Sequence, residues 1–252
     1  MSRYSSADIG FLLLGPYNLA NVSNKLEVSA SNPVVDTTPF GVSAAAYGQP
    51  GVKRFEITGH DGWYDDTTGS LNTATITLAS TENVFMFGYK GNTAGVKAIC
   101  AAGALQAAFK RSFAVGDFTK ASMELGVSGV IEDATIVSAL AQVDDSPLDT
   151  ETADIDLGAT GGGTTGGNVY LSCTQLDLSG RPGFTVTFED SADAITYAPQ
   201  TAMTALTLIG AEKKASTDQT VNRYVAAAWA WGGAGGTPTA TFVLAVSVNA
   251  PH

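Results

Sequence analysis

The residue types best suited to chemistry lie in FEITGHDGWYDD, residues 55 to 66, which contains one of the two histidines of the chain. His60 stands beside Asp61, and Asp65 and Asp66 follow closely. Such a group could orient an imidazole for general base catalysis or bind a divalent metal ion. Neither function fits, because His60 and Asp61 point to opposite faces of a strand and the other histidine is the terminal His252. We interpret the cluster as the end of a strand followed by an acidic turn, and we predict no metal site.

Other catalytic patterns fail on spacing. The glycine run at 161–167 is not followed by GK[ST], and GYKGNTAGVK at 88–97 misses the spacing of a phosphate-binding loop. The sequence has no GxSxG elbow and no EF-hand spacing. Cys100 and Cys173 lie among apolar or small residues, which predicts buried thiols without a disulfide. We therefore predict that the protein is not an enzyme and holds no cofactor.

The tryptophans allow a binding function in principle. Trp63, Trp229 and Trp231 could form a stacking platform for sugars or single-stranded bases. Aromatic residues of β proteins more often anchor a core or an interface. A carbohydrate-binding β-sandwich is therefore kept as an alternative.

Charge excludes a general affinity for nucleic acid. The chain has 24 acidic and 13 basic residues, a formal net charge of −11, whereas phosphate binding requires cationic side chains. No Lys or Arg occurs from Ala121 to Gly180, a stretch that contains ten acidic residues. The stretch can be a solvated linker or a surface that repels another polyanion.

Hydrophobic alternation predicts an all-β fold with one or two short helices. Residues 119–128 and 237–248 alternate as strands do, and 55–58 and 184–188 also favour strands. The outer face of 237–248 is small and uncharged, as expected of a covered strand. The alanine-rich stretch 94–114 favours strands with a turn. Short helices are expected after residues 65–69 and after Pro199.

The two halves of the chain resemble each other. FEITGHD at 55–61 matches FTVTFED at 184–190, without the histidine, and MELGVS at 123–128 matches FVLAVS at 242–247. This similarity predicts a first β module at 1–143 with an N-terminal arm, an acidic, glycine-rich linker at 144–167, and a second β module at 168–252.

Several segments together resemble the major tail, or tail tube, proteins of long-tailed bacteriophages. They are FLLLGPYNL at 11–19, DTTPFG at 36–41, FEITGHDGWYDD, KGNTAG at 90–95, GDFTKASMELGVSG at 116–129, EDSADAITY at 189–197 and NRYVAAAW at 222–229. The resemblance implies a β-sandwich or barrel subunit that assembles into stacked rings, forming a tube through which DNA passes without specific binding. It also implies contacts with other tail proteins and a place in the virion after assembly in the host cytoplasm.

Combined with the charge pattern, the resemblance implies an acidic lumen that repels DNA. The candidate lumen-facing acids are Asp144, Asp145, Asp149, Glu151, Asp154 and Asp156. Two tube modules in one chain would build the usual sixfold ring from three copies, so we predict a trimeric ring with pseudo-sixfold symmetry rather than a hexamer. The alternatives are another phage structural protein, such as a capsid-decorating protein or a baseplate component. The only apolar run near the N-terminus, Phe11 to Leu14, is too short for a signal peptide or a membrane span, and predicts a soluble protein.

Overall fold

β-strands account for the regular structure in the computed structural model of this chain. The structure describes residues 9–20, 23–31, 35–36, 47–48, 54–63, 82–113, 120–145, 152, 154–158, 166–216 and 220–248. Within these ranges it is an all-β protein, which confirms the predicted fold class. The helix expected after Pro199 is wrong, because residues Ala198–Ala202 form a strand, while the one expected after 65–69 lies outside the described residues. None of the described segments is a helix that could cross a membrane.

The strands follow in chain order. They are β1 (Leu12–Leu14), β2 (Tyr17–Asn18), β3 (Ser23–Ser31), β4 (Val35–Asp36), β5 (Tyr47–Gly48), β6 (Arg54–Trp63), β7 (Asn83–Phe87), β8 (Lys97–Ser112), β9 (Lys120–Val127), β10 (Ile131–Asp144), β11 (Ile155–Asp156), β12 (Gly167–Asp177), β13 (Phe184–Ser191), β14 (Ala198–Ala202), β15 (Gly210–Ala215), β16 (Tyr224–Trp231) and β17 (Thr239–Val248). The short β4 and β5 pair with each other.

The chain forms two units. Unit 1 contains Met1–Asn21, Asn83–Ala102 and Ile131–His252, and unit 2 contains Val22–Glu82 and Gly103–Val130. The boundary falls inside β8. This division differs from the modules 1–143 and 168–252 and the linker 144–167 expected from the sequence, because β10 pairs with β17 and both belong to unit 1.

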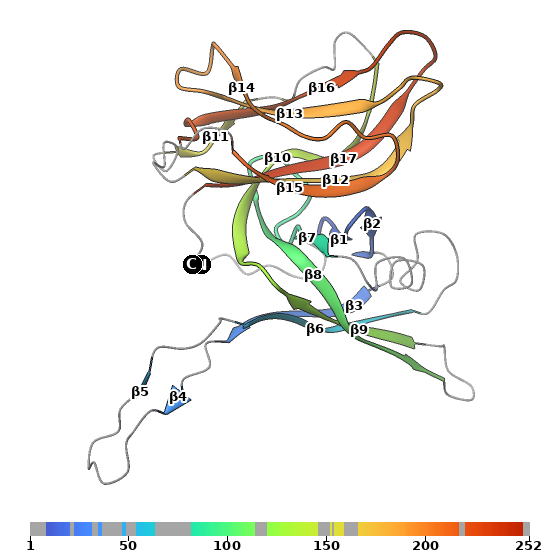
Figure 1. The fold of residues 1–252 in the computed structure, drawn as a ribbon, viewed down its shortest axis with the longest axis vertical. Helices are drawn as coiled ribbons and strands as arrows, with labels where there is room; N and C mark the ends of the chain where they lie inside the picture. Colours follow the sequence, from blue (N-terminus) through green and yellow to red (C-terminus); the bar gives the residue numbers. More distant parts are fainter. Residues whose placement is uncertain are drawn as a thin grey trace. The chain divides into compact units, whose positions relative to one another are not determined.

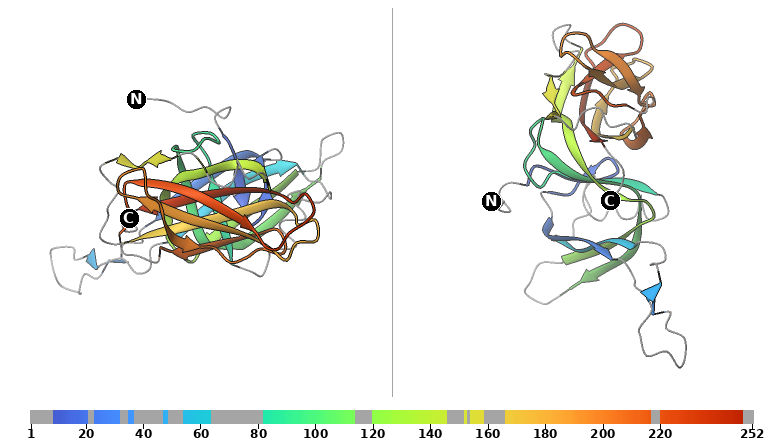
Figure 2. Two further views of the ribbon diagram at one scale, coloured as in Figure 1. Left: turned by 90° about the horizontal axis from the view of Figure 1, so that it is seen from above. Right: turned by 90° about the vertical axis from the view of Figure 1, so that its left-hand side faces the viewer.

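Unit 1 is a sandwich of two antiparallel layers. One layer follows the order β15-β12-β17-β10, and the other follows β11-β16-β13-β14. Figure 1 shows β13 and β16 facing β12 and β17, and Figure 2 shows these layers from two further sides. β17 is a central strand whose residues alternate between two cores, which explains why its second face is small and uncharged, as predicted.

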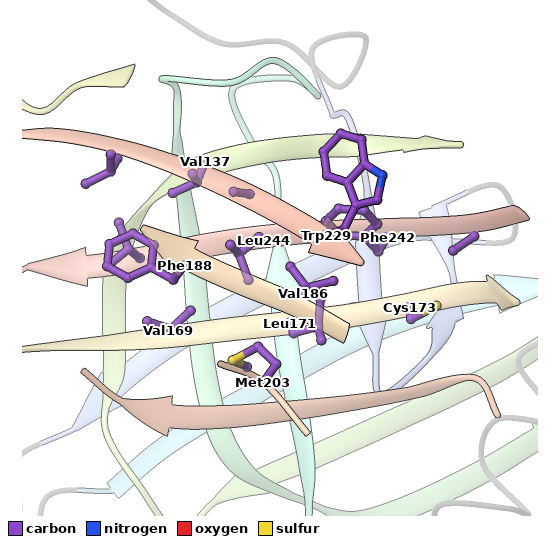
Figure 3. Packing of buried hydrophobic residues seen from close by; sticks show 14 of the residues in the cluster. Val137, Val169, Leu171, Cys173, Val186, Phe188, Met203, Trp229, Phe242 and Leu244 are labelled. Carbon is purple, nitrogen blue, oxygen red and sulfur yellow. The ribbon is translucent and has the colours of Figure 1, made fainter. Parts of the chain in front are cut away.

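The main core fills the space between the two layers. Buried side chains from β12, β13, β16 and β17 meet there (Figure 3). The ring of Phe242 lies 5.6 Å from the ring of Phe184 and 5.8 Å from that of Trp229, measured between centroids. Aromatic pairs at these separations add to the stabilisation that burial alone provides.

A second core covers the opposite face of the β12-β17-β10 layer. Phe11 and Leu13 of the first segment and Val84 and Met86 of β7 pack there with Tyr170. The hydroxyl of Ser172 donates a 2.7 Å hydrogen bond to the carbonyl of Gly15, so the turn after β1 is tied to β12. Unit 1 therefore buries both faces of its central strands.

Unit 2 is built on an antiparallel sheet in the order β3-β6-β9-β8. Ala121, Met123, Leu125 and Val127 of β9 are buried while the residues between them are not, which confirms the predicted alternation.

The alanine-rich stretch is a strand, as favoured, but the expected turn is absent because β8 is continuous. Gly103 takes the place of the turn with a φ of 71°, and a Cβ built there would lie 2.1 Å from the Ser128 hydroxyl. Only glycine fits this position, because it combines a left-handed conformation with a close neighbour.

The internal similarity does not extend to strand pairing. FEITGHD lies on β6 and MELGVS on β9, and these two strands pair directly. Their counterparts lie on β13 and β17, which belong to different layers of the unit 1 sandwich. Phe242, Leu244 and Val246 of β17 are buried, as are the matching residues Met123, Leu125 and Val127 of β9. The matched strands nevertheless occupy different places in the fold.

Candidate functional site

The His60 cluster is part of a strand and its following segment. β6 runs to Trp63, so His60 and Asp61 lie within the strand, near its end. His60 is opposite Met123 and Asp61 is opposite Ser122 on β9. Asp65 and Asp66 lie outside the described residues. In the part of the chain that the structure describes, no group of three or more His, Cys, Asp or Glu residues could hold a metal ion.

The six candidate lumen-facing acids fall into three groups. Asp144 ends β10 and Asp154 is exposed before β11. Asp145 and Asp156 each form an ion pair with an arginine. Asp149 and Glu151 lie outside the described residues. Their orientation toward a lumen stays a prediction, but two of the six charges already have a cationic partner.

Arg181, which lies between β12 and β13, contacts the residue after β10 and the loop between β16 and β17. Its guanidinium pairs with both carboxylate oxygens of Asp145, and its Nε donates a 2.7 Å hydrogen bond to the carbonyl of Gly235. The Arg181 side chain is only 7% exposed, although Asp145 is 42% exposed. A planar guanidinium binds a carboxylate through two parallel bonds, a geometry that lysine cannot reproduce. Asp145 therefore has a structural role within unit 1.

Replacing Arg181 by lysine is expected to lower the free energy of unfolding by about 1 kcal/mol, since the carbonyl of Gly235 and one carboxylate oxygen of Asp145 lose their donors. Urea denaturation measures the change. Arg223→Lys is the comparison, because that bidentate pair is exposed on both sides, and it should cost less than about 0.5 kcal/mol. Equal losses in the two variants would show that Arg181 is not a special contact.

Arg223 and Asp156 form a more exposed pair. The Arg223 Nε and Nη2 atoms donate to the two carboxylate oxygens at 2.7 and 2.6 Å. The hydrogen bonds from Arg223 and from the Gly158 amide lower the pKa of Asp156 to about 2. The pair therefore stays ionised over the physiological pH range, and it connects β11 to the start of β16.

The proposed tryptophan platform is wrong for Trp229. Its side chain is 8% exposed and belongs to the main core, so it cannot present a face to a sugar. Trp231 stacks at 4.5 Å on the ring of Phe184, and its indole Nε1 donates to the carbonyl of Asp144. The side chain of Trp63 lies outside the described ones. Both described tryptophans are anchors of the sandwich.

The sequence analysis missed a buried carboxylate. Glu132 is 4% exposed and accepts hydrogen bonds of 2.6 Å from the Tyr170 hydroxyl and from the side-chain amide of Asn168. The Lys213 ammonium lies 4.0 Å from the same carboxylate and 5.6 Å from the centre of the Tyr170 ring. The alternation of IEDATI, which places Glu132 in phase with Ala134 and Ile136, was the signal in the sequence that could have revealed it.

Burial favours the neutral forms of Tyr170 and Cys100, which lie near Glu132. The pKa values of Tyr170 and Cys100 are raised well above their ordinary values, mainly because desolvation disfavours their charged forms, and further by the nearby Glu132 carboxylate. Tyr170 therefore acts as a neutral hydrogen-bond donor. The thiol of Cys173, also buried, has its pKa raised to about 12, chiefly by desolvation. Both cysteines are buried free thiols, as predicted.

A second buried acid holds a loop. Asp190 is 1% exposed, and its Oδ2 atom accepts hydrogen bonds from the Gln200 side chain at 3.2 Å and from the Asn222 amide at 2.6 Å. These bonds fix the loop that leads into Arg223. The buried carboxylates described in unit 1 thus organise connections between strands.

Comparisons with known proteins give a faint likeness. No protein-family model matches the sequence. No curated protein matches it either. Among solved structures, the chain is similar to the crystal structure of SPP1 Dit (gp 19.1), described as a paradigm of the hub adsorption apparatus in phages that infect Gram-positive bacteria. The TM-score is 0.36 and the identity 10%, over 94% of this chain and 98% of that one. Both values are too low to support a conclusion about function.

Proposed function

We propose that this protein is a structural, non-enzymatic component of a bacteriophage tail, a subunit that assembles with copies of itself into the stacked rings of a tail tube. The sequence segments that resemble tail tube proteins support this function. Two of the longest, FEITGHDGWYDD and GDFTKASMELGVSG, contribute the paired strands β6 and β9 of unit 2. These two segments therefore lie in one continuous sheet, whereas NRYVAAAW lies mostly on β16 of unit 1.

The edges of that sheet are the observation that carries the proposal. Among the described strands, β3 pairs with β6 and residues 104–112 of β8 pair with β9, which makes β3 and β8 the outer strands of the described part of this sheet. A sheet that ends in exposed edges can add strands from another chain. Because β3 and β8 differ in sequence, contact between them would be head-to-tail, and head-to-tail contacts generate closed rings or helical arrays.

Electron microscopy of the purified full-length protein tests this function. We expect hollow rods built from stacked rings, and the mass per ring distinguishes three copies from six. The trimer prediction depended on an internal duplication, and since the matched strands hold different places in the fold, six copies would correct the stoichiometry without affecting the function. Protein that stays monomeric at every concentration and salt condition would contradict the proposal.

The same images separate the alternatives. Closed rings that do not stack would favour a baseplate component, and binding only to capsids added to the sample would favour a decorating protein. In a tube, the other partners would be tail proteins at its two ends, and DNA would pass through the lumen without specific binding. The net charge of −11 supports this passage, because an acidic wall does not hold phosphate.

A further inference from the structure

β16 is a strand without charge. Its sequence is YVAAAWAW, and on one side it pairs with β13 along its whole length, from Tyr224 to Trp231. Strands with aromatic and small apolar residues and no charged residue are prone to pair with identical strands of other molecules. The other side of β16 therefore requires protection in the isolated subunit.

A short segment of the same chain covers that side. We define it as the strap, which consists of Thr152 and Asp154–Gly158. Thr152 exchanges two 2.9 Å hydrogen bonds with Ala227, one from its amide to the Ala227 carbonyl and one from the Ala227 amide to its hydroxyl. β11 pairs with Val225 and Tyr224, and the amide of Leu157 donates to the carbonyl of Arg223. The strap thus occupies the backbone groups along the first half of β16.

Two kinds of contact hold the strap in place. Ile155 and Leu157 are partly buried against the main core, which supplies an apolar anchor. The bidentate pair between Arg223 and Asp156 supplies an electrostatic one, and the Asp156 carboxylate also accepts a 2.7 Å bond from the Gly158 amide. Asp154 is exposed and adds negative charge to the outer side of the strap. Charge at a sheet edge is a common device against pairing between molecules.

We propose that the strap is an edge guard, latched by Arg223, that prevents β16 of one copy from pairing with β16 of a second copy. The pairing it prevents is antiparallel and symmetric, since both partners would present the same edge. The guard is an internal contact of unit 1 and does not depend on the tail tube function.

Hydrogen exchange and light scattering test the guard on the full-length protein. Arg223→Gln removes the latch, and the double change Ile155→Ser and Leu157→Ser removes the apolar anchor. Lys214→Gln is the matched control, because Lys214 forms a partly exposed ion pair with Glu212 elsewhere in the same sandwich. The exchange of the Ala227 and Leu157 amides reports on the strap, and light scattering during storage reports on association.

We expect the Ala227 amide to exchange about fivefold faster in Arg223→Gln, the scale of one exposed ion pair, and faster still in the double variant. Both variants should aggregate faster than the wild type, and their β16 amides should become protected again as the protein concentration rises. The control should match the wild type. Faster exchange without faster association would overturn the guarding role, and unchanged exchange in Arg223→Gln would overturn the latch.

Discussion

Replacing Glu132 by alanine is expected to lower the free energy of unfolding by about 3 kcal/mol. The change leaves the Tyr170 hydroxyl and the Asn168 amide without their acceptor, and an unsatisfied buried donor costs about 1–3 kcal/mol. Lys213 loses its nearest carboxylate, and a cavity remains where the side chain was. Urea denaturation, followed by tryptophan fluorescence from Trp229 and Trp231 of unit 1, measures the loss.

Asp133→Ala is the matched control for Glu132→Ala. Asp133 is the next residue of β10, carries the same charge and is exposed, so its removal should change stability by less than about 0.5 kcal/mol. Tyr170→Phe is a second test of the same network, since it removes one hydrogen-bond donor to Glu132 and leaves the Glu132 carboxylate buried. A loss in Glu132→Ala no greater than in Asp133→Ala would show that the buried network does not stabilise unit 1.

The sequence predicted those features of the fold that depend on local alternation. The inward residues of β9 and both faces of β17 follow from a period of two, because each strand has a fixed relation to a buried layer. Trp229 and Trp231 were favoured as core or interface anchors because aromatic residues of β proteins more often have that role. The all-β class followed from composition and from these strands together.

Pairing between strands that are distant in the sequence determined the features of the fold that local patterns did not predict. Pro199 reads as a start signal for a helix, but its segment pairs with β13 at the edge of a sheet, where a strand tolerates proline. The alanine-rich β8 reads as two strands with a turn, yet Gly103 lets one strand continue. The similarity between the two halves of the chain reflects residues that suit strands, and it did not predict which strands pair.

In the acidic stretch from Ala121 to Gly180, the sequence likewise did not predict which acids form ion pairs or are buried. Counting charges from 121 to 180 could not show that Asp145 and Asp156 pair with arginines outside that range, 36 and 67 residues away. Nor could the count separate Glu132, which is buried, from its exposed neighbour Asp133. Net charge therefore overstates how many acids are available to act on DNA.

Under the proposed tail tube function, neutralising Asp149, Glu151 and Asp154 together, to Asn, Gln and Asn, is expected to slow DNA ejection from virions by about fivefold. The reason is the loss of roughly 1 kcal/mol of repulsion between the wall and the DNA backbone. These three are chosen because Asp145 and Asp156 hold ion pairs within unit 1, so changing them would also disturb the fold. Ejection triggered in vitro and followed by a DNA-binding dye measures the rate.

A second triple variant separates position from net charge. Glu27→Gln, Glu124→Gln and Asp133→Asn remove the same three charges from exposed sites outside the six candidate acids. If the candidate acids line the lumen, the first variant ejects slowly and the second ejects normally, in virions whose tails have equal length. Equal slowing in both would mean that only the total charge matters, and normal ejection in both would remove the acidic segment from the path of the DNA. Lower salt should widen the difference, because the Debye length grows from about 8 Å at physiological ionic strength to about 30 Å at 0.01 M.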